Sequence, residues 1–275
     1  MTDAFFMSNR GVIGIFDSGV GGLTIWKEIT SLLPDESIYY IADSANAPYG
    51  TKSPNEIIDL SITNTQKLID LGAKIIVVAC NTATTQAIDV LRDKFEIPFV
   101  GIEPAIKPAA LASKTRSIGV LATYGTLESE HFNTTKDKFT QDVEVVTRVG
   151  EGLVTAIENG QLHTSKLKVL LKEHLDFLIH PKTDHLVLGC THYPLLIPII
   201  QKIIGDKIII VDSGVAVAMQ TKRILESNNL LADQEQEVKH QLYSTKDITI
   251  MKEIVNELGF ANQKNITYSS LYQSE

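Results

Sequence analysis

The chain has 275 residues, of which 44% are hydrophobic and 21% charged, as is typical of a folded protein with a buried core. The net charge is −8, and the lysines and arginines are scattered, without the basic stripe of a nucleic-acid-binding protein. No apolar run approaches the roughly 18 residues of a membrane span, and the start MTDAFFMSNR lacks the features of a signal peptide. We therefore expect a cytoplasmic protein without nucleic-acid or membrane partners.

Short apolar runs alternate with amphipathic stretches. The runs that predict strands are Val12–Phe16, Ile38–Ile41, Ile75–Ala79, Phe99–Ile102, Ser117–Ala122, Val143–Val146, His185–Gly189 and Ile208–Val211. The stretches that predict helices are Leu23–Leu33, Pro54–Leu71, Thr84–Phe95, Leu127–Phe139, Leu153–Asn159, Ser165–Leu178 and Leu195–Ile203. Apolar runs without polar alternation favour parallel sheets covered on both faces. The alternation of strands and helices predicts an α/β fold.

Helix 54–71 has the clearest boundary signals. Ser53 and Glu56 have the spacing of a capping box, and Pro54 occupies the first helical position. Gly72 is a typical helix stop.

Polar clusters follow the predicted strands, and ligands of α/β folds bind at such strand ends. The clusters are Asp17-Ser18-Gly19, Asp43-Ser44, Pro48-Tyr49-Gly50, Cys80-Asn81-Thr82, Cys190-Thr191-His192 and Asp212-Ser213-Gly214. An Asp-Ser-Gly loop and a Cys loop thus occur in each half, which suggests a weak internal repeat of two similar parts. Prolines interrupt the pattern at residues 104–108, so we predict a first domain of residues 1–103 plus 214–275 and a second of residues 104–213.

Cys80 and Cys190 are the two cysteines of the chain. A disulfide is not expected in a reducing cytosol, and so few cysteines with scattered histidines give little support for a zinc site. Two bases on opposite faces of an amino-acid α-carbon, one protonated and one not, invert that centre. A cysteine suits this task because its surroundings can lower its pKa from about 8.5. The sequence therefore favours an inverting pair of cysteines and no metal.

Candidate partners lie near each cysteine. His192 is two residues from Cys190, and Asp17 ends a strand that we expect beside the one before Cys80. Helix N-termini after Gly22 and Thr82 favour thiolates and carboxylates. Neutral hydrogen-bonding groups for an amino acid come from Ser18, Asn81, Thr82, Thr123 and Thr191.

Structural explanations stay open at this stage. A buried cysteine is often an apolar filler, and Asp17 or Asp212 is equally suited to cap a helix or shape a turn. The loop Gly19-Val20-Gly21-Gly22, with Asp43 after the next strand, imitates a dinucleotide-binding fingerprint. The match is incomplete because Thr24 holds the third glycine position, and Asp17 would repel a pyrophosphate.

Taken together, six motifs carry a family resemblance. They are IGIFDSGVGGLTI, YIADSANAPYG, VVACNTATT, GIEPAIKPA, LGCTHYPLL and VDSG, in this order from residue 13 to residue 214. The sequence resembles the glutamate racemases of the aspartate/glutamate racemase superfamily. The resemblance implies two similar α/β domains, each a mainly parallel sheet flanked by helices, with the active site in the cleft between them. It also implies that no cofactor or metal is needed.

The resemblance also implies residue roles. Cys80 and Cys190 take the two acid/base positions, Asp17 and His192 are their polar partners, and Glu158 in GLVTAIENG is a further catalytic carboxylate. The preceding TRVGEG differs from the Cys-Pro-bearing form of many members. The expected substrate-binding residues are Asp17, Ser18, Pro48, Tyr49, Gly50, Asn81, Thr82, Thr123, Thr191 and His192.

The implied function is racemization of L- and D-glutamate, which supplies D-glutamate for peptidoglycan, by a homodimer whose small-molecule substrate is glutamate. Cys80 would act on D-glutamate and Cys190 on L-glutamate. Two alternatives stay open: an aspartate or related racemase on the same fold, and a nucleotide- or gyrase-binding protein.

Overall fold

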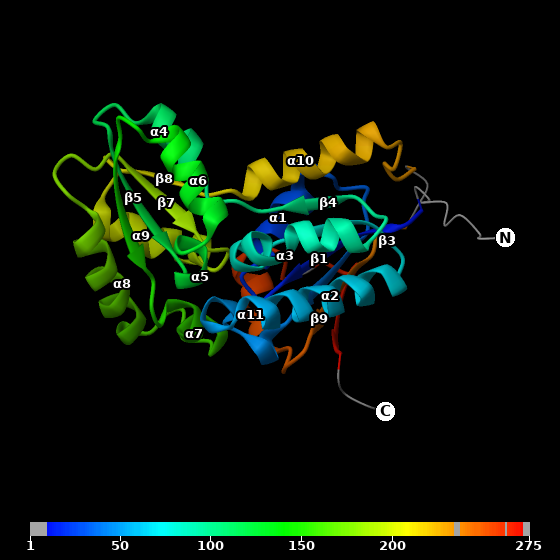
Figure 1. Cartoon of the computed structure of the whole chain (residues 1–275). Helices are drawn as coiled ribbons and strands as arrows, with labels where there is room; N and C mark the ends of the chain where they lie inside the picture. Colours follow the sequence, from blue (N-terminus) through cyan, green and yellow to red (C-terminus); the bar gives the residue numbers. More distant parts are fainter. Residues whose placement is uncertain (1–9, 234–236, 262, 272–275) are drawn as a thin grey trace.

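The structure is a computed structural model that describes residues 10–233, 237–261 and 263–271. It contains two β-sheets flanked by helices, which form the two halves of the molecule in Figure 1. The larger sheet has the strand order β10-β9-β2-β1-β3-β4 and the smaller one β6-β5-β7-β8. Neighbouring strands in both sheets are parallel. The predicted α/β class with two similar units is confirmed.

The larger sheet is built around β1, which is buried along its whole length and pairs with β2 and β3. Its strands are β1 (Val12–Asp17), β2 (Ile38–Ala42), β3 (Ala73–Val78), β4 (Phe99–Gly101), β9 (His240–Ser244) and β10 (Ile266–Ser270). The helices connected with it are α1 (Leu23–Leu32), α2 (Pro54–Asp70), α3 (Asn81–Lys94), α10 (Gly214–Ser227) and α11 (Thr249–Glu257).

The smaller sheet lies on the green and yellow side of Figure 1. Its strands are β5 (Ser117–Ala122), β6 (Glu144–Val149), β7 (His185–Gly189) and β8 (Ile209–Val211). The helices of this part are α4 (Ile106–Ala112), α5 (Tyr124–Leu127), α6 (Glu130–Phe139), α7 (Leu153–Glu158), α8 (Ser165–Leu178) and α9 (Ile197–Ile204). Short 3-10 helices are η1 (Ser44–Asn46), η2 (Tyr49–Thr51) and η3 (Tyr193–Leu196).

The chain passes from one sheet to the other twice, after β4 and after β8. The largest apolar cluster includes Ile15 and Val77 of the first sheet and Leu121 and Leu188 of the second, so the core continues between them. The predicted boundaries of 1–103 plus 214–275 and 104–213 stay a prediction, and residues 1–9, 234–236, 262 and 272–275 lie outside the described part. No described helix combines the length and apolar character needed to cross a membrane.

The capping box of α2 is confirmed, with Ser53 and Glu56 exchanging both hydrogen bonds. The predicted helix over residues 127–139 is wrong in its extent, because these residues contain the end of α5 and all of α6. The reason is local, because the Ser129 side chain accepts a hydrogen bond from the Phe132 amide and starts a new helix there. The prolines at 104–108 do not prevent a helix either, since Pro108 lies in the first turn of α4, where its missing N–H is not needed.

Candidate active site

The loops after the strands of both sheets meet around one small cavity of about 10 Å³. Its lining contains most of the predicted site residues: Ser18, Pro48, Tyr49, Gly50, Cys80, Asn81, Thr82, Thr123, Cys190, Thr191 and His192. The other two, Asp17 and Glu158, lie behind this lining and are hydrogen-bonded to it. The structure therefore brings all the predicted site residues together.

Cys80 lies at the N-cap of α3, which begins at Asn81, three residues before its predicted start at Thr84. Its Sγ accepts from the Ala83 amide at 3.5 Å and lies 3.6 Å from the Ser18 hydroxyl, which in turn donates to Asp17. Burial raises the pKa of the Cys80 thiol, and the charge of Asp17 raises it further. The hydrogen bond from the Ala83 amide, at the N-terminus of α3, lowers this pKa, as expected, but by less than burial raises it. In this closed form Cys80 is therefore a thiol.

Cys190 follows β7, and its Sγ lies 3.8 Å from Nδ1 of His192. On the other side of the ring, Nε2 lies 2.6 Å from Oε1 of Glu158. Burial lowers the pKa of His192, but the neighbouring Cys190 and Glu158 raise it more, so this pKa lies well above its ordinary value. His192 is thus a buried imidazolium between a sulfur and a carboxylate.

Glu158 ends α7 and is almost fully buried. Burial raises its pKa, but the hydrogen bond and charge of His192, together with Ser44 and the Val20 amide, lower it below the ordinary value. The carboxylate is therefore ionised. It joins the second sheet to the first because the Val20 amide after β1 donates to Oε1 at 2.6 Å.

Asp17 makes a second link between the sheets. It is fully buried at the end of β1 and accepts hydrogen bonds from Ser18 at 3.0 Å and from Thr191, across the cleft, at 2.8 Å. Burial raises its pKa despite these contacts and the charge of His192. Thr24 adds a further contact, since its hydroxyl donates to the Thr191 carbonyl at 3.1 Å.

The glycine-rich loop after β1 lies against these groups. A Cβ atom on Gly19 would lie 1.9 Å from Oε1 of Glu158, and one on Gly21 would lie 2.3 Å from Nδ1 of His192. Only glycine permits such close approach. The Glu158 carboxylate thus lies against the loop that a pyrophosphate would need, and packing against the second sheet explains the glycines without a dinucleotide.

Asn81 has an unused acceptor at this cavity. Its buried Oδ1 atom lacks a hydrogen-bond partner among the described residues, and the amide stands at the N-terminus of α3. The hydroxyls of Thr82 and Thr123 lie 2.9 Å apart beside it. Tyr49 differs from these because its hydroxyl donates to Asp43 at 2.6 Å and is not free for a ligand.

The sequence profile of the Asp/Glu/Hydantoin racemase family matches residues 23–221. The chain belongs to this family. It is 43% identical over 248 residues to a glutamate racemase of Ectopseudomonas mendocina, which covers 90% of this chain and 94% of that one. Among solved structures, a glutamate racemase isoform of Bacillus anthracis has a TM-score of 0.83 at 33% identity, with 96% and 98% of the two chains covered. Glutamate racemase of Escherichia coli, in complex with L-glutamate and the activator UDP-MurNAc-ala, has a TM-score of 0.83 at 31% identity, covering 95% and 98%.

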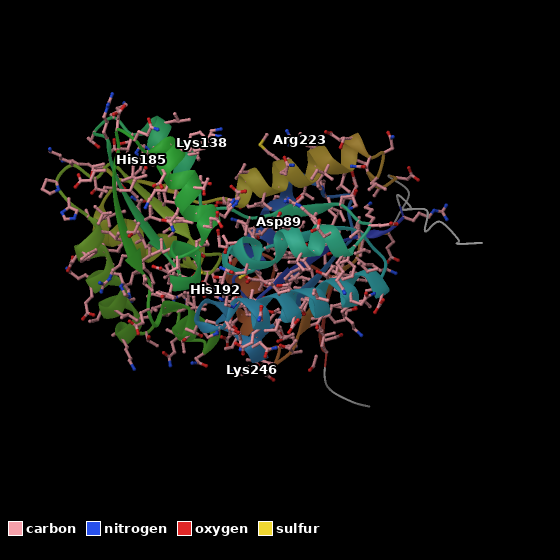
Figure 2. All side chains as sticks on the ribbon, viewed as in Figure 1. Asp89, Lys138, His185, His192, Arg223 and Lys246 are labelled. Carbon is pink, nitrogen blue, oxygen red and sulfur yellow. The ribbon has the colours of Figure 1, made fainter. Side chains whose placement is uncertain are left out.

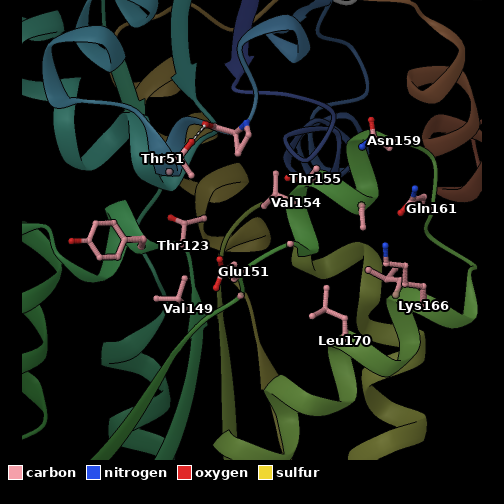
Figure 3. A pocket seen from close by; sticks show the side chains of 17 residues that line it. Thr51, Thr123, Val149, Glu151, Val154, Thr155, Asn159, Gln161, Lys166 and Leu170 are labelled. Carbon is pink, nitrogen blue, oxygen red and sulfur yellow. Dashed lines mark hydrogen bonds between the residues drawn. The ribbon is translucent and has the colours of Figure 1, made fainter.

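This member of the racemase family has a second, larger cavity of about 870 Å³ beside the first (Figure 3). The two share Pro48, Gly50, Thr123 and Val154 in their linings. Val154 was not among the predicted site residues, because an apolar side chain on α7 is typical of a helix facing the core. The larger cavity opens to exposed side chains such as Lys166, so it connects the shared wall with the surface.

Proposed function

We propose that this protein interconverts L-glutamate and D-glutamate by a two-base mechanism in which Cys80 and Cys190 act on opposite faces of the substrate. The observation that carries this proposal is that two free, buried cysteines from different sheets line one cavity, each with its own polar partners. Glutamate as the substrate is supported by the glutamate racemases to which the chain is similar over nearly its whole length.

In the proposed reaction, the thiolate on one face takes the α-proton, so that a C–H bond breaks and an S–H bond forms. The thiol on the other face then donates its proton to the planar carbanion, and a new C–H bond forms with inverted configuration. Family resemblance assigns Cys80 to D-glutamate and Cys190 to L-glutamate. No cofactor takes part in these steps.

The surrounding groups have separate proposed roles. The free Oδ1 of Asn81 accepts from the substrate ammonium group, and the N-terminus of α3 with the hydroxyl of Thr82 binds a carboxylate. His192 and Glu158 stabilise the thiolate of Cys190, while Asp17 acts on Cys80 through Ser18.

Substrate binding requires the two sheets to separate. A volume of about 10 Å³ is at or below the about 10–15 Å³ that a single water needs, so the closed cavity has no room for an amino acid. The larger cavity, separated by the wall of Gly50, Thr123 and Val154, is the proposed route from solvent. Opening this wall exposes both cysteines to the same ligand.

The direct test follows the optical rotation of a solution of one enantiomer of glutamate or aspartate after pure protein is added. The protein is prepared without added cofactor, and each of the four enantiomers is tested separately. We expect loss of rotation with both glutamate enantiomers and much slower change with aspartate. Unchanged glutamate rotation would refute the proposal, and faster aspartate turnover would assign the aspartate alternative.

We further propose a cytoplasmic homodimer that supplies D-glutamate for peptidoglycan, in line with the family.

A further inference from the structure

A third cavity, of about 170 Å³, lies behind the catalytic cavity on the far side of Glu158. Besides Glu158, its lining includes Ser44 from the loop after β2, Asn159 after α7, and Lys246 with Asp247 after β9. The last three side chains are exposed, so this cavity reaches the surface. Figure 2 labels His192 and Lys246 near the junction of the two halves of the molecule.

Glu158 separates this cavity from the reacting sulfur. The chain of contacts runs from Sγ of Cys190 to Nδ1 of His192 at 3.8 Å, and from Nε2 to Glu158 at 2.6 Å. The same Oε1 atom receives the Val20 amide. One carboxylate therefore touches the histidine of the active site and also lines a space that is open to solvent and large enough for several water molecules.

Ser44 is a second polar group in the lining of this cavity that is suited to hold a water molecule. It is nine-tenths buried, and its Oγ has no hydrogen-bond partner of good geometry among the described residues. Its backbone is held in place because the Thr245 hydroxyl accepts from the Ala45 amide at 2.9 Å and donates to Asp43. A fixed hydroxyl that lies close enough to Glu158 to lower the pKa of that carboxyl, but makes no hydrogen bond of good geometry, is suited to hold a water molecule against the carboxylate.

We propose that this cavity is the port through which Cys190 exchanges its proton with solvent, with Glu158 as the relay and Ser44 as the positioning residue for the water. The proposal rests on the proposed function, because it concerns the resetting of a two-base enzyme. After each turnover the free enzyme holds its protons in the opposite arrangement, and the same reaction direction requires Cys190 and Cys80 to exchange protons before the next substrate.

The transfer uses groups already in contact. When the Cys190 thiol loses its proton, the S–H bond breaks and an Nδ1–H bond forms, which gives the His192 imidazolium. The Nε2–H bond of that ring then breaks and an O–H bond forms on Glu158. That O–H bond then breaks as the proton passes to water in the cavity, giving hydronium and leaving a neutral imidazole whose Nδ1–H faces the thiolate. Uptake follows the same steps in reverse, with no net change in electrons.

The Cys80 side lacks an equivalent path among the described residues. Sγ of Cys80 contacts the Ser18 hydroxyl, and this hydroxyl donates to Asp17, which is fully buried. Cys80 therefore exchanges protons through the substrate cavity, whereas Cys190 has a route of its own. Blocking the port should slow the resetting of the free enzyme while leaving the chemistry on bound substrate unaffected.

The experiment compares Ser44→Val with Ser44→Thr, which have nearly the same size and differ in the hydroxyl. Radiolabelled glutamate is first racemized to equilibrium, and an excess of one unlabelled enantiomer is then added. If resetting is slow, the net conversion of the unlabelled enantiomer accumulates the free enzyme in one protonation form. That form accepts only one of the two labelled enantiomers, so the ratio of labelled L- to D-glutamate moves transiently away from equilibrium. Ser44→Ala provides the same hydroxyl deletion with a smaller side chain, should the valine variant fail to fold.

We expect the label to be displaced by Ser44→Val or Ser44→Ala, with resetting about tenfold slower than in Ser44→Thr, the effect of one lost hydrogen bond. Initial rates at low substrate should match the wild type. The proposed port would be refuted if the ratio of labelled enantiomers were displaced equally in the valine and threonine variants. It would also be refuted if folded valine and alanine variants showed no displacement. An inactive wild type would refute the proposed function instead, so the two failures are distinguishable.

Discussion

Nε2 of His192 lies 2.6 Å from Oε1 of Glu158, and both side chains press against the glycine loop after β1 in the other sheet. An ion pair formed within the smaller sheet's loops is thus enclosed by the larger sheet. This arrangement shields the ion pair from water only while the two halves are closed, because separation of the sheets would expose the pair.

Replacing either cysteine tests the proposed acid/base pair. Cys80→Ser and Cys190→Ser should each reduce racemization by about 10²–10⁴-fold, because a hydroxyl is a far weaker acid and base than a thiol. The fold should persist, since the two side chains differ by one atom. Circular dichroism spectra check the fold and optical rotation the activity; near-normal turnover by either folded variant would remove that cysteine from the mechanism.

His192→Asn should affect the two directions of the reaction unequally in kcat. The two enantiomers are equally stable, so kcat/KM must fall equally in both directions, and any asymmetry appears in kcat and KM separately. Because His192 touches Cys190 and not Cys80, kcat should fall more in the direction that begins with proton removal by Cys190. Equal losses of kcat would indicate a general binding role.

Glu158→Gln should alter how stability depends on pH. The folded pKa of His192 lies above its ordinary value, so its protonation contributes stability that is fully present below pH about 6.5 and is lost as pH rises through the folded pKa. Glu158 has a lowered folded pKa, so its contribution is present above about pH 4.5 and is lost as pH falls. Removing one partner of this buried pair should cost about 3 kcal/mol between these limits.

The measurement is the free energy of unfolding in urea at several pH values. The difference between wild type and Glu158→Gln should be largest between these two limits and shrink at higher pH. Glu151→Gln is the matched control, because Glu151 is an exposed carboxylate near the start of the same helix. A pH-independent difference, or one shared by the control, would contradict the assigned ion pair.

Gly19→Ala should disturb the same pair by crowding. The added Cβ would lie 1.9 Å from Oε1 of Glu158, so the carboxylate must move and withdraw from His192. Activity should fall about 100-fold, as expected for a displacement of about 1 Å in a catalytic site. Gly119→Ala is the control, since its Cβ would meet its nearest atom at 3.4 Å. A fully active Gly19→Ala enzyme would show that the loop does not fix Glu158.

The sequence was sufficient to predict the apolar strands β1 to β8 to within one residue at most of their ends, because buried parallel strands are continuous apolar runs. The exceptions are informative: β3 begins two residues early at Ala73, and β6 extends three residues further to Val149. Strands β9 (HQLYS) and β10 (ITYSS) were not predicted. Both alternate polar and apolar residues near the sheet edge, where less burial is required.

Strand-end positions placed the site loops correctly, but they did not specify which side chains meet. Asp17 and Asp212 both stand in Asp-Ser-Gly loops, yet Asp17 reaches Thr191 across the cleft, whereas Asp212 accepts from the Gly214 amide at the start of α10. Local sequence is almost the same in the two loops. The difference comes from tertiary placement, which single-sequence patterns do not encode. For Glu158, the family resemblance was the only signal.

The central claim is that two different groups exchange protons with the two faces of glutamate, and deuterium incorporation tests it most directly. Each enantiomer is incubated with the protein in D₂O, and the reaction is stopped early. We predict that product from either enantiomer carries α-deuterium from the first turnovers, while recovered substrate contains much less. Product that retains the substrate's own α-proton would indicate a single shuttling base and would contradict the assignment of Cys80 and Cys190 as opposing acid and base.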